Sequence, residues 1–217
     1  MLLIIIIIVL IIIYHIKSIN VNDDIYFLYK NSLSKHECEE LIHMSKKYTL
    51  ETKLDPVDDK PEYQVDIYDV NSLPHENNIL SEDLYTKAIH IYNKHIKKKL
   101  THVKHPDFIF LKRYKQGERI HIPIHYDDAQ QSFNFLLSDT NDFTGGELYI
   151  FDKTQSKLIN KSVTTRTRET FINTYKNLPI IHNFEQGDLI KYEGGEQMHG
   201  ILPVKSGVRY LLTFFFE

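Results

Sequence analysis

Two histidines, one carboxylate and one guanidinium occur at the spacing of a metal site. His125 and Asp127 are two residues apart, and Arg209 follows the distant His199 by ten residues. Because residues two apart on a β-strand point to the same face, we expect the first pair to project together. With His199 they form the two-histidine, one-carboxylate set of non-haem Fe(II), which leaves positions open for a bidentate keto acid and dioxygen. The sequence therefore predicts iron chemistry, with Arg209 holding the far end of the keto acid.

Other interpretations of these residues stay open. The histidines and Asp127 are alternatively surface groups on a strand, with His199 ending a turn, and Arg209 alternatively forms a salt bridge on the last strand. An unpaired Arg beside the mostly apolar residues 210–216 would be costly, so a partner is expected. Asp128 is a rival ligand, but adjacent strand residues face opposite ways, which favours Asp127.

Three segments carry a resemblance to a known family. Residues 125–138 resemble the first metal-binding strand pair of the Fe(II)/2-oxoglutarate dioxygenases that hydroxylate collagen-like peptides. Residues 142–148 are similar to the Asp-aromatic-x-Gly-Gly segment that follows in that family, and residues 199–210 match its closing signature. The basic residue of that signature is usually Lys in prolyl 4-hydroxylases and Arg in lysyl hydroxylases, so Arg209 favours the lysyl type.

The resemblance implies a role for seven residues. The implied metal ligands are His125, Asp127 and His199. The residues implied to contact 2-oxoglutarate are Arg209, Tyr114, Ser132 and Asn134. Core packing is the alternative for the tyrosine. The implied cofactors are Fe(II), O2 and ascorbate, with 2-oxoglutarate as cosubstrate, which is decarboxylated to succinate.

The expected function is hydroxylation of prolyl or lysyl residues in a peptide or protein. A nucleic-acid demethylase of the same fold is an alternative, but a net charge of −3 gives no attraction to nucleic acid, and residues 210–216 lack the second arginine of those enzymes. The third hypothesis is an inactive, membrane-anchored jelly-roll binding protein. The choice of proline or lysine and the oligomeric state stay open.

The first 16 residues are almost entirely apolar and predict a membrane anchor. As a helix they would reach about 24 Å, against a hydrocarbon core of about 30 Å. No basic region precedes them and no convincing cleavage site follows. Residues 1–19 are therefore interpreted as an uncleaved, single-pass signal anchor. The protein would belong to the secretory pathway if the domain is luminal. A cleaved signal peptide is the alternative. Residues 20–217 are then one dioxygenase domain, and the single cysteine, Cys38, excludes an intrachain disulfide.

Helices precede strands along the rest of the chain. A capping box at Ser34 and Glu37 predicts a helix, and a second is expected over residues 82–98. The expected strands are residues 108–114, 120–124, 132–137, 147–151, 180–184, 189–192 and 210–216. This order predicts an α+β chain: a double-stranded β-helix, or jelly roll, with N-terminal supporting helices, preceded by the hydrophobic anchor helix.

Three segments are interpreted as less regular. Residues 20–24 are expected to be a polar tether, and residues 51–78 a loop with one strand at most. The polar segment 152–170 is interpreted as a solvated hairpin, with a mobile lid as the functional alternative. The sequence Asn160-Lys161-Ser162 is a glycosylation sequon that is used only if the domain is luminal.

Overall fold

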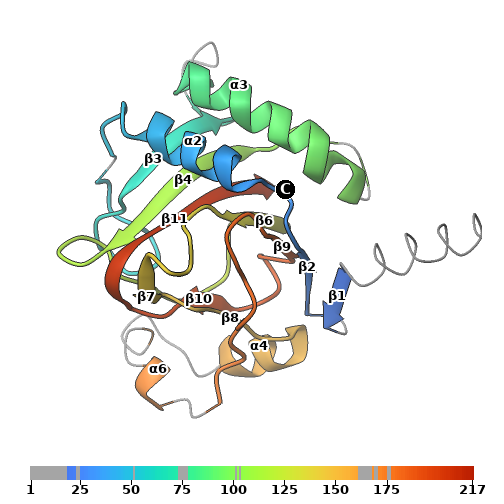
Figure 1. Ribbon diagram of the computed structural model, residues 1–217. Helices are drawn as coiled ribbons and strands as arrows, with labels where there is room; N and C mark the ends of the chain where they lie inside the picture. The colour runs from blue at the N-terminus through green and yellow to red at the C-terminus, as the bar shows by residue number, and fades with distance from the viewer. Residues whose placement is uncertain are drawn as a thin grey trace, which may run out of the picture.

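Two antiparallel β-sheets face each other in the computed structural model, which describes residues 19–22, 25–50, 52–72, 78–100, 102, 104–160, 168, 171–174 and 177–217 (Figure 1). The larger sheet runs in the order β1 (Ile19–Asn22), β2 (Tyr26–Tyr29), β9 (Leu189–Tyr192), β6 (Gln131–Leu136), β11 (Val204–Phe216), β4 (Phe108–Lys115) and β3 (Gln64–Asp69). The short β7 (Phe143–Gly145) also pairs with β11. The smaller sheet has the order β5 (Ile122–His125), β10 (His199–Ile201) and β8 (Leu148–Ile150). The chain alternates between the sheets, as in a jelly roll, so the α+β jelly-roll prediction is confirmed.

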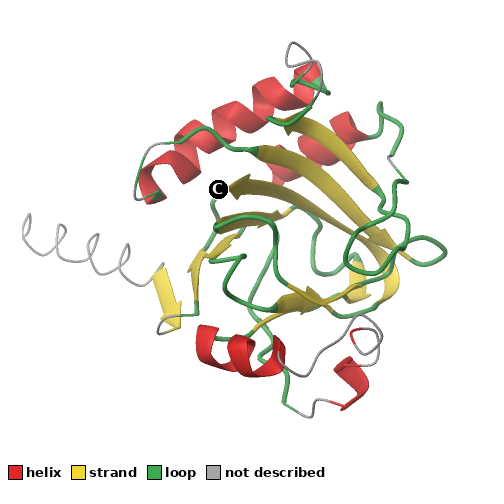
Figure 2. Ribbon diagram, turned by 180° about the vertical axis from the view of Figure 1, so that it is seen from behind, coloured by secondary structure: helices red, strands yellow, loops and turns green. Residues whose placement is uncertain are grey.

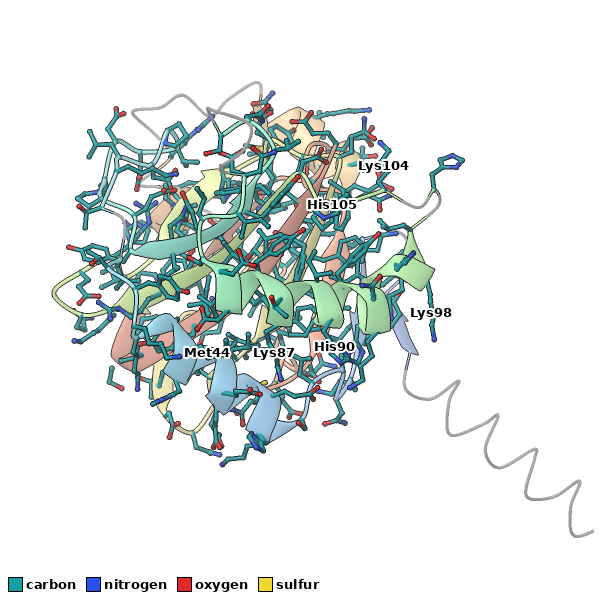
Figure 3. The ribbon with its side chains drawn as sticks, turned by 90° about the horizontal axis from the view of Figure 1, so that it is seen from above. Met44, Lys87, His90, Lys98, Lys104 and His105 are labelled. Carbon is teal, nitrogen blue, oxygen red and sulfur yellow. The ribbon has the colours of Figure 1, made fainter. Side chains whose placement is uncertain are left out.

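The predicted supporting helices cover the outer face of the larger sheet (Figures 1 and 2). They are α2 (Lys35–Ser45) and α3 (Glu82–Ile91), and the latter continues through a π-helical turn (Tyr92–Ile96) and a 3-10 turn (Lys97–Lys99). Lys87 of α3 lies beside α2, where its ammonium donates to Glu40 at 2.6 Å (Figure 3). Leu41 of α2 and Leu84 of α3 share one buried cluster with Ile109 of the sheet.

The opposite face of the larger sheet is the one that faces the functional residues. Side chains alternate along β11, so Tyr210, Leu212 and Phe214 pack into the helix-side core. Leu211 packs into a second core with residues of the smaller sheet, and Thr213 lines a cavity on that side. Arg209 is two residues before Leu211 on β11, so its side chain points to the same face of the strand and lies between the sheets.

The structure corrects three local predictions. Residues 180–184 form no strand; only Ile180 makes an isolated bridge, to Tyr149. The start of the expected hairpin 152–170 is instead the helix α4 (Lys153–Asn160), and most of the following residues lie outside the described part. The expected tether begins as strand β1, which pairs with β2. The prediction of one strand in residues 51–78 is confirmed by β3.

The predicted anchor helix, residues 1–16, lies outside the described residues and stays a prediction. Among the helices of the described ranges, which include the short α6 (Phe171–Thr174), none has the length and apolar character needed to cross a bilayer.

Candidate metal centre

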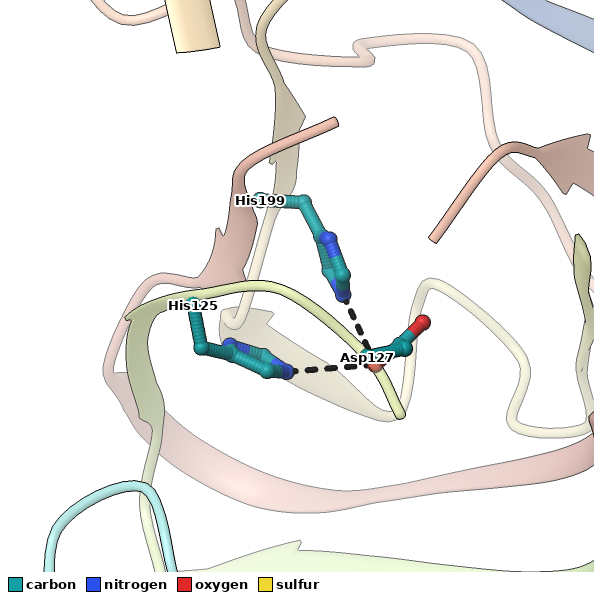
Figure 4. A group of neighbouring side chains, drawn as sticks. All are labelled: His125, Asp127 and His199. Carbon is teal, nitrogen blue, oxygen red and sulfur yellow. Dashed lines mark hydrogen bonds and ion pairs between the residues drawn. The ribbon is translucent and has the colours of Figure 1, made fainter. Parts of the chain in front are cut away.

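Three predicted ligands converge at the edge of the smaller sheet (Figure 4). His125 ends β5, His199 begins β10, and the two residues pair directly in the antiparallel register. Asp127 lies just past the end of β5, and its Oδ1 atom is 3.3 Å from His125 Nε2 and 3.2 Å from His199 Nε2. The sequence analysis expected Asp127 to lie on the strand. In the structure the strand ends at His125, and Asp127 turns toward the two histidines from the segment that follows.

Backbone carbonyls orient both imidazoles. His125 Nδ1 donates to the carbonyl of Pro123 at 2.8 Å, and His199 Nδ1 donates to that of Gln197 at 2.9 Å. Because a carbonyl oxygen only accepts, the proton of each neutral ring sits on Nδ1. The Nε2 lone pairs are therefore directed toward the Asp127 carboxylate, as metal ligands require.

The donor set fits a divalent metal ion. Two ligand atoms at about 2.1 Å from one ion and at right angles around it lie about 3 Å apart. The two Nε2–Oδ1 distances of 3.2 and 3.3 Å match that geometry, and all three ligand atoms lie within 4.8 Å of one another. Burial opposes ionisation of Asp127, yet in the metal-free site the charge of a protonated His199 and hydrogen bonds from the Nε2–H groups of His199 and His125 hold the pKa of its carboxyl well below its usual range. A charged carboxylate and two imidazoles on one side of an ion are the ligand face of non-haem Fe(II) sites.

Ser132 and Gly194 hold the Asp127 carboxylate in place. The Ser132 hydroxyl donates to Asp127 Oδ2 at 2.5 Å. A Cβ at Gly194 would lie 2.3 Å from that hydroxyl oxygen and 2.6 Å from the same Oδ2, so only glycine fits there. The resemblance implied a contact between Ser132 and 2-oxoglutarate, and the structure shows its hydroxyl bonded to the Asp127 carboxylate. Gly194 was not among the predicted site residues, and its signal in the sequence is the glycine pair at positions 194 and 195, shortly before the ligand His199.

The ligands form part of the wall of a cavity of about 420 Å³ between the sheets. Asn134, which also lines it, accepts from the Thr213 hydroxyl at 2.7 Å and donates to the Tyr192 hydroxyl at 3.2 Å. The Tyr192 ring lies 4.7 Å from the His199 ring between centroids. Asn134 therefore lines the cavity and helps to order the wall beside the ligands, and its contact with 2-oxoglutarate stays a prediction.

Arg209 is a buried cation without an ion pair to any described residue. It is 1% exposed, and its Nη1 atom has no hydrogen-bond partner. Burial lowers the pKa of its guanidinium to about 10. The guanidinium carbon lies 5.8 Å from the centroid of the Tyr114 ring, and Tyr114 lines the cavity. An unpaired buried charge is costly, so the site suits a carboxylate ligand that pairs with Arg209.

Gly146 makes room for this arginine. Its φ of +71° is in the left-handed region, and a Cβ there would lie 2.9 Å from Arg209 Cδ. Gly145 and Gly146 both have a positive φ, which glycine adopts without steric strain. Gly146 also allows the arginine side chain to pass.

Asp128, the rival ligand, does not join the metal-binding group. It is exposed, and the group within ligand distance consists of His125, Asp127 and His199.

The fold was compared with known proteins. No protein-family model matches the sequence, and no curated protein matches it. An oxidoreductase of the 2OG-Fe(II) oxygenase family from Burkholderia pseudomallei superposes with a TM-score of 0.56 at 14% identity, covering 88% of this chain and 84% of its own. A prolyl hydroxylase from Trichoplax adhaerens, in complex with a hypoxia inducible factor peptide fragment, superposes with a TM-score of 0.56 at 10% identity, covering 90% and 84%. The fold is that of the 2OG-Fe(II) oxygenases.

A viral collagen prolyl hydroxylase from Paramecium Bursaria Chlorella virus-1 is also similar in structure, with a TM-score of 0.48 at 19% identity, over 89% of this chain and 96% of its own.

Proposed function

We propose that the protein is an Fe(II)- and 2-oxoglutarate-dependent dioxygenase that hydroxylates prolyl or lysyl residues of a peptide or protein. The observation that carries the proposal is the convergence of His125, Asp127 and His199 on one point in the cavity wall. Proteins with a jelly-roll fold have many different functions, so the fold alone does not indicate iron chemistry. The ligand set does. An inactive binding protein would have no need of all three ligands and of a buried arginine next to Tyr114 in the cavity wall.

Each residue has a distinct task in this proposal. His125, Asp127 and His199 hold Fe(II) on one side and leave its other positions for 2-oxoglutarate and dioxygen. When bound, Fe(II) with 2-oxoglutarate supplies the oxidising power that hydroxylates an unactivated C–H bond while succinate and carbon dioxide are formed. Arg209 pairs with the distal carboxylate of 2-oxoglutarate, and Tyr114 forms the wall beside it. Ascorbate is expected to keep the iron ferrous.

Two observations support a peptide substrate. The cavity combines apolar side chains such as Ile122, Leu148 and Phe110 with polar groups near the ligands, as a site that excludes water from a side chain needs. One of the two solved structures with the better superposition is a prolyl hydroxylase in complex with a peptide fragment. The net charge of −3 gives no support to nucleic acid as substrate.

The test is the release of succinate from labelled 2-oxoglutarate in the presence of Fe(II), ascorbate and a panel of Pro- and Lys-containing peptides. We expect one group of peptides to stimulate turnover and to gain one oxygen atom in mass. His199→Ala is expected to abolish both signals. Turnover with methylated oligonucleotides but with no peptide would support a demethylase instead, and a chain that binds no metal would contradict the proposal.

A further inference from the structure

A group of buried ion pairs lies at the edge of the cavity, away from the metal ligands. Lys112 of β4 places its Nζ atom 3.0 Å from Asp55 Oδ2 and 3.3 Å from Glu62 Oε1. Arg119 adds contacts to Asp55 at 3.2 Å and to Asp58 at 3.0 Å. These side chains fix the segment from Leu54 to Pro61, whose ends pair in an antiparallel bridge, against β4.

The group has more carboxylates than cations. Three acids face two basic side chains, and each of the five side chains is at most 9% exposed. Glu62, which is 7% exposed, keeps one carboxylate oxygen uncompensated: its Oε2 atom is buried and has no hydrogen-bond partner. Glu62, Asp55 and Lys112 all line the cavity. Burial raises the pKa of the Glu62 carboxyl, because Lys112 offsets only part of its desolvation.

The rest of the cavity wall favours a cation with an apolar stem. Besides the ligand Asp127, the acidic residues that line the cavity are Asp55, Glu62, Asp69, Asp107, Asp128 and Glu217. The lysines that line it are Lys53 and Lys112. Phe110 lies between Phe108 and Phe215 on the same wall, with ring centroids 4.9 and 5.3 Å away. Aromatic rings pack against the alkyl part of a Lys or Arg side chain and attract its charged end.

We propose that Glu62, supported by Asp55, binds the cationic side chain of a Lys or Arg residue that flanks the hydroxylated residue of the peptide substrate. The inference rests on the proposed function and adds a sequence preference to it. An acidic side chain at the same place would meet an excess of negative charge, because Lys112 is already shared by two carboxylates. Glu62 is thus a specificity-determining residue, separate from the metal ligands.

The position of Glu62 in the sheet explains why the cation belongs to a flanking residue. Ser132 of β6 contacts the ligand Asp127, whereas Glu62 lies two residues before β3. The strand order β6, β11, β4, β3 puts three strand spacings between them, about 14 Å across the sheet, and the register adds a further offset because Ser132 is level with Asp69, seven residues after Glu62. That separation exceeds the reach of the residue under attack, so the cation belongs to another residue of an extended peptide.

The test uses the full chain and peptides in which Lys, Arg, norleucine or Glu is placed in turn at each position around a central Pro or Lys. We expect the KM for the best Lys or Arg peptide to be on the order of tenfold lower than for its norleucine analogue. Glu62→Gln, which keeps the size of the side chain, is expected to remove this difference while the KM for 2-oxoglutarate stays the same. Glu118→Gln is the matched control: Glu118 pairs with Arg113 outside the cavity lining, so its loss should leave the preference intact.

A second readout separates this inference from the proposed function. The same peptides, labelled with fluorescein, are titrated with the metal-free chain, and the Kd is measured by anisotropy. A Kd that favours Lys or Arg peptides in the wild type and not in Glu62→Gln supports the site even if no peptide stimulates turnover. Equal Kd values for the Lys and norleucine peptides in the wild type, or an equal loss of both in Glu62→Gln, would overturn the inference.

Discussion

Arg209 is the residue whose chemistry depends most on a ligand. Without a carboxylate partner its burial costs free energy, so Arg209→Met, which keeps the length and removes the charge, is expected to stabilise the ligand-free protein. A gain of about 1 kcal/mol corresponds to a rise in Tm of about 2–4 °C for a chain of this size. The same variant should lose the stabilisation by 2-oxoglutarate that the wild type shows, and its KM for 2-oxoglutarate should rise on the order of 100-fold. Thermal unfolding with and without 2-oxoglutarate measures both effects.

Arg209→Lys is the control for charge alone. It is expected to retain part of the response to 2-oxoglutarate, since it keeps a cation but not the paired donors. If Arg209→Met instead lowers Tm by several degrees, the arginine is a structural ion pair and its assignment is wrong.

Gly194 controls the position of one metal ligand. Gly194→Ala is expected to push the Asp127 carboxylate out of place, because the added Cβ would lie 2.6 Å from its Oδ2. Metal affinity should fall about 10- to 100-fold, the range found when a ligand loses its support. Titration with Co(II), followed by its absorption, measures the affinity. Gly195→Ala is the control, since its Cβ would approach the backbone oxygen of Ala129 and not the carboxylate.

At this scale the sequence identified the residues but not their supports. The spacing of His125, Asp127 and His199 predicted the ligands, because a shared metal restricts both residue type and separation. The sequence could not show that Glu62 and Lys112 form an ion pair, since ion pairs between distant segments leave no periodic pattern. The site assignments of Arg209 and Tyr114 remain proposals.

The first element that packs on the sheet, α2, begins with a capping box whose energetics depend on pH. Hydrogen bonds donated by the backbone amide and the hydroxyl of Ser34 lower the pKa of the Glu37 carboxyl from 4.5 to about 2. A folded-state pKa below the unfolded value stabilises the protein above pH 4.5, and that contribution is lost as pH falls toward 2. Glu37→Gln is therefore expected to flatten the stability curve in this window. Denaturant unfolding at a series of pH values tests it, and an unchanged acid slope would contradict it.

Elements with local signals were predicted well, and those decided by distant contacts were not. The capping box at Ser34 placed the start of α2 correctly. For α4, the abundance of Lys, Thr and Ser favoured a hairpin, yet Asp152 caps the helix by accepting from the Gln155 amide at 2.7 Å. The hydroxyl of the buried Ser156 also accepts from the amide of Met198, 42 residues away, at 2.8 Å. Such a contact is visible only in the folded chain.

At the scale of the whole molecule, the apolar N-terminal segment predicts where the domain is held. We propose that residues 1–16 anchor the dioxygenase domain to a membrane as a single-pass signal anchor. The full chain is then expected to stay with membranes after alkaline extraction. Its release into the soluble fraction in mature, shortened form would show a cleaved signal peptide instead.

The sequon at Asn160 reports the orientation. Asn160 is exposed at the end of α4, so a luminal domain would be glycosylated there. We expect a mobility shift on gels that Asn160→Gln and glycosidase treatment both remove if the domain is luminal. A membrane-bound chain with no shift would place the domain on the cytoplasmic side.

The central claim is that one ferrous ion and one 2-oxoglutarate molecule share this site, and anaerobic titration with both tests it most directly. Bound together, they give a visible charge-transfer absorption band that neither gives alone. We predict that the wild type shows this band with one Fe(II) per chain, that His199→Ala abolishes it, and that Arg209→Met shifts its 2-oxoglutarate dependence to higher concentration. A wild-type chain that shows no band, or a band that survives in His199→Ala, would contradict the account.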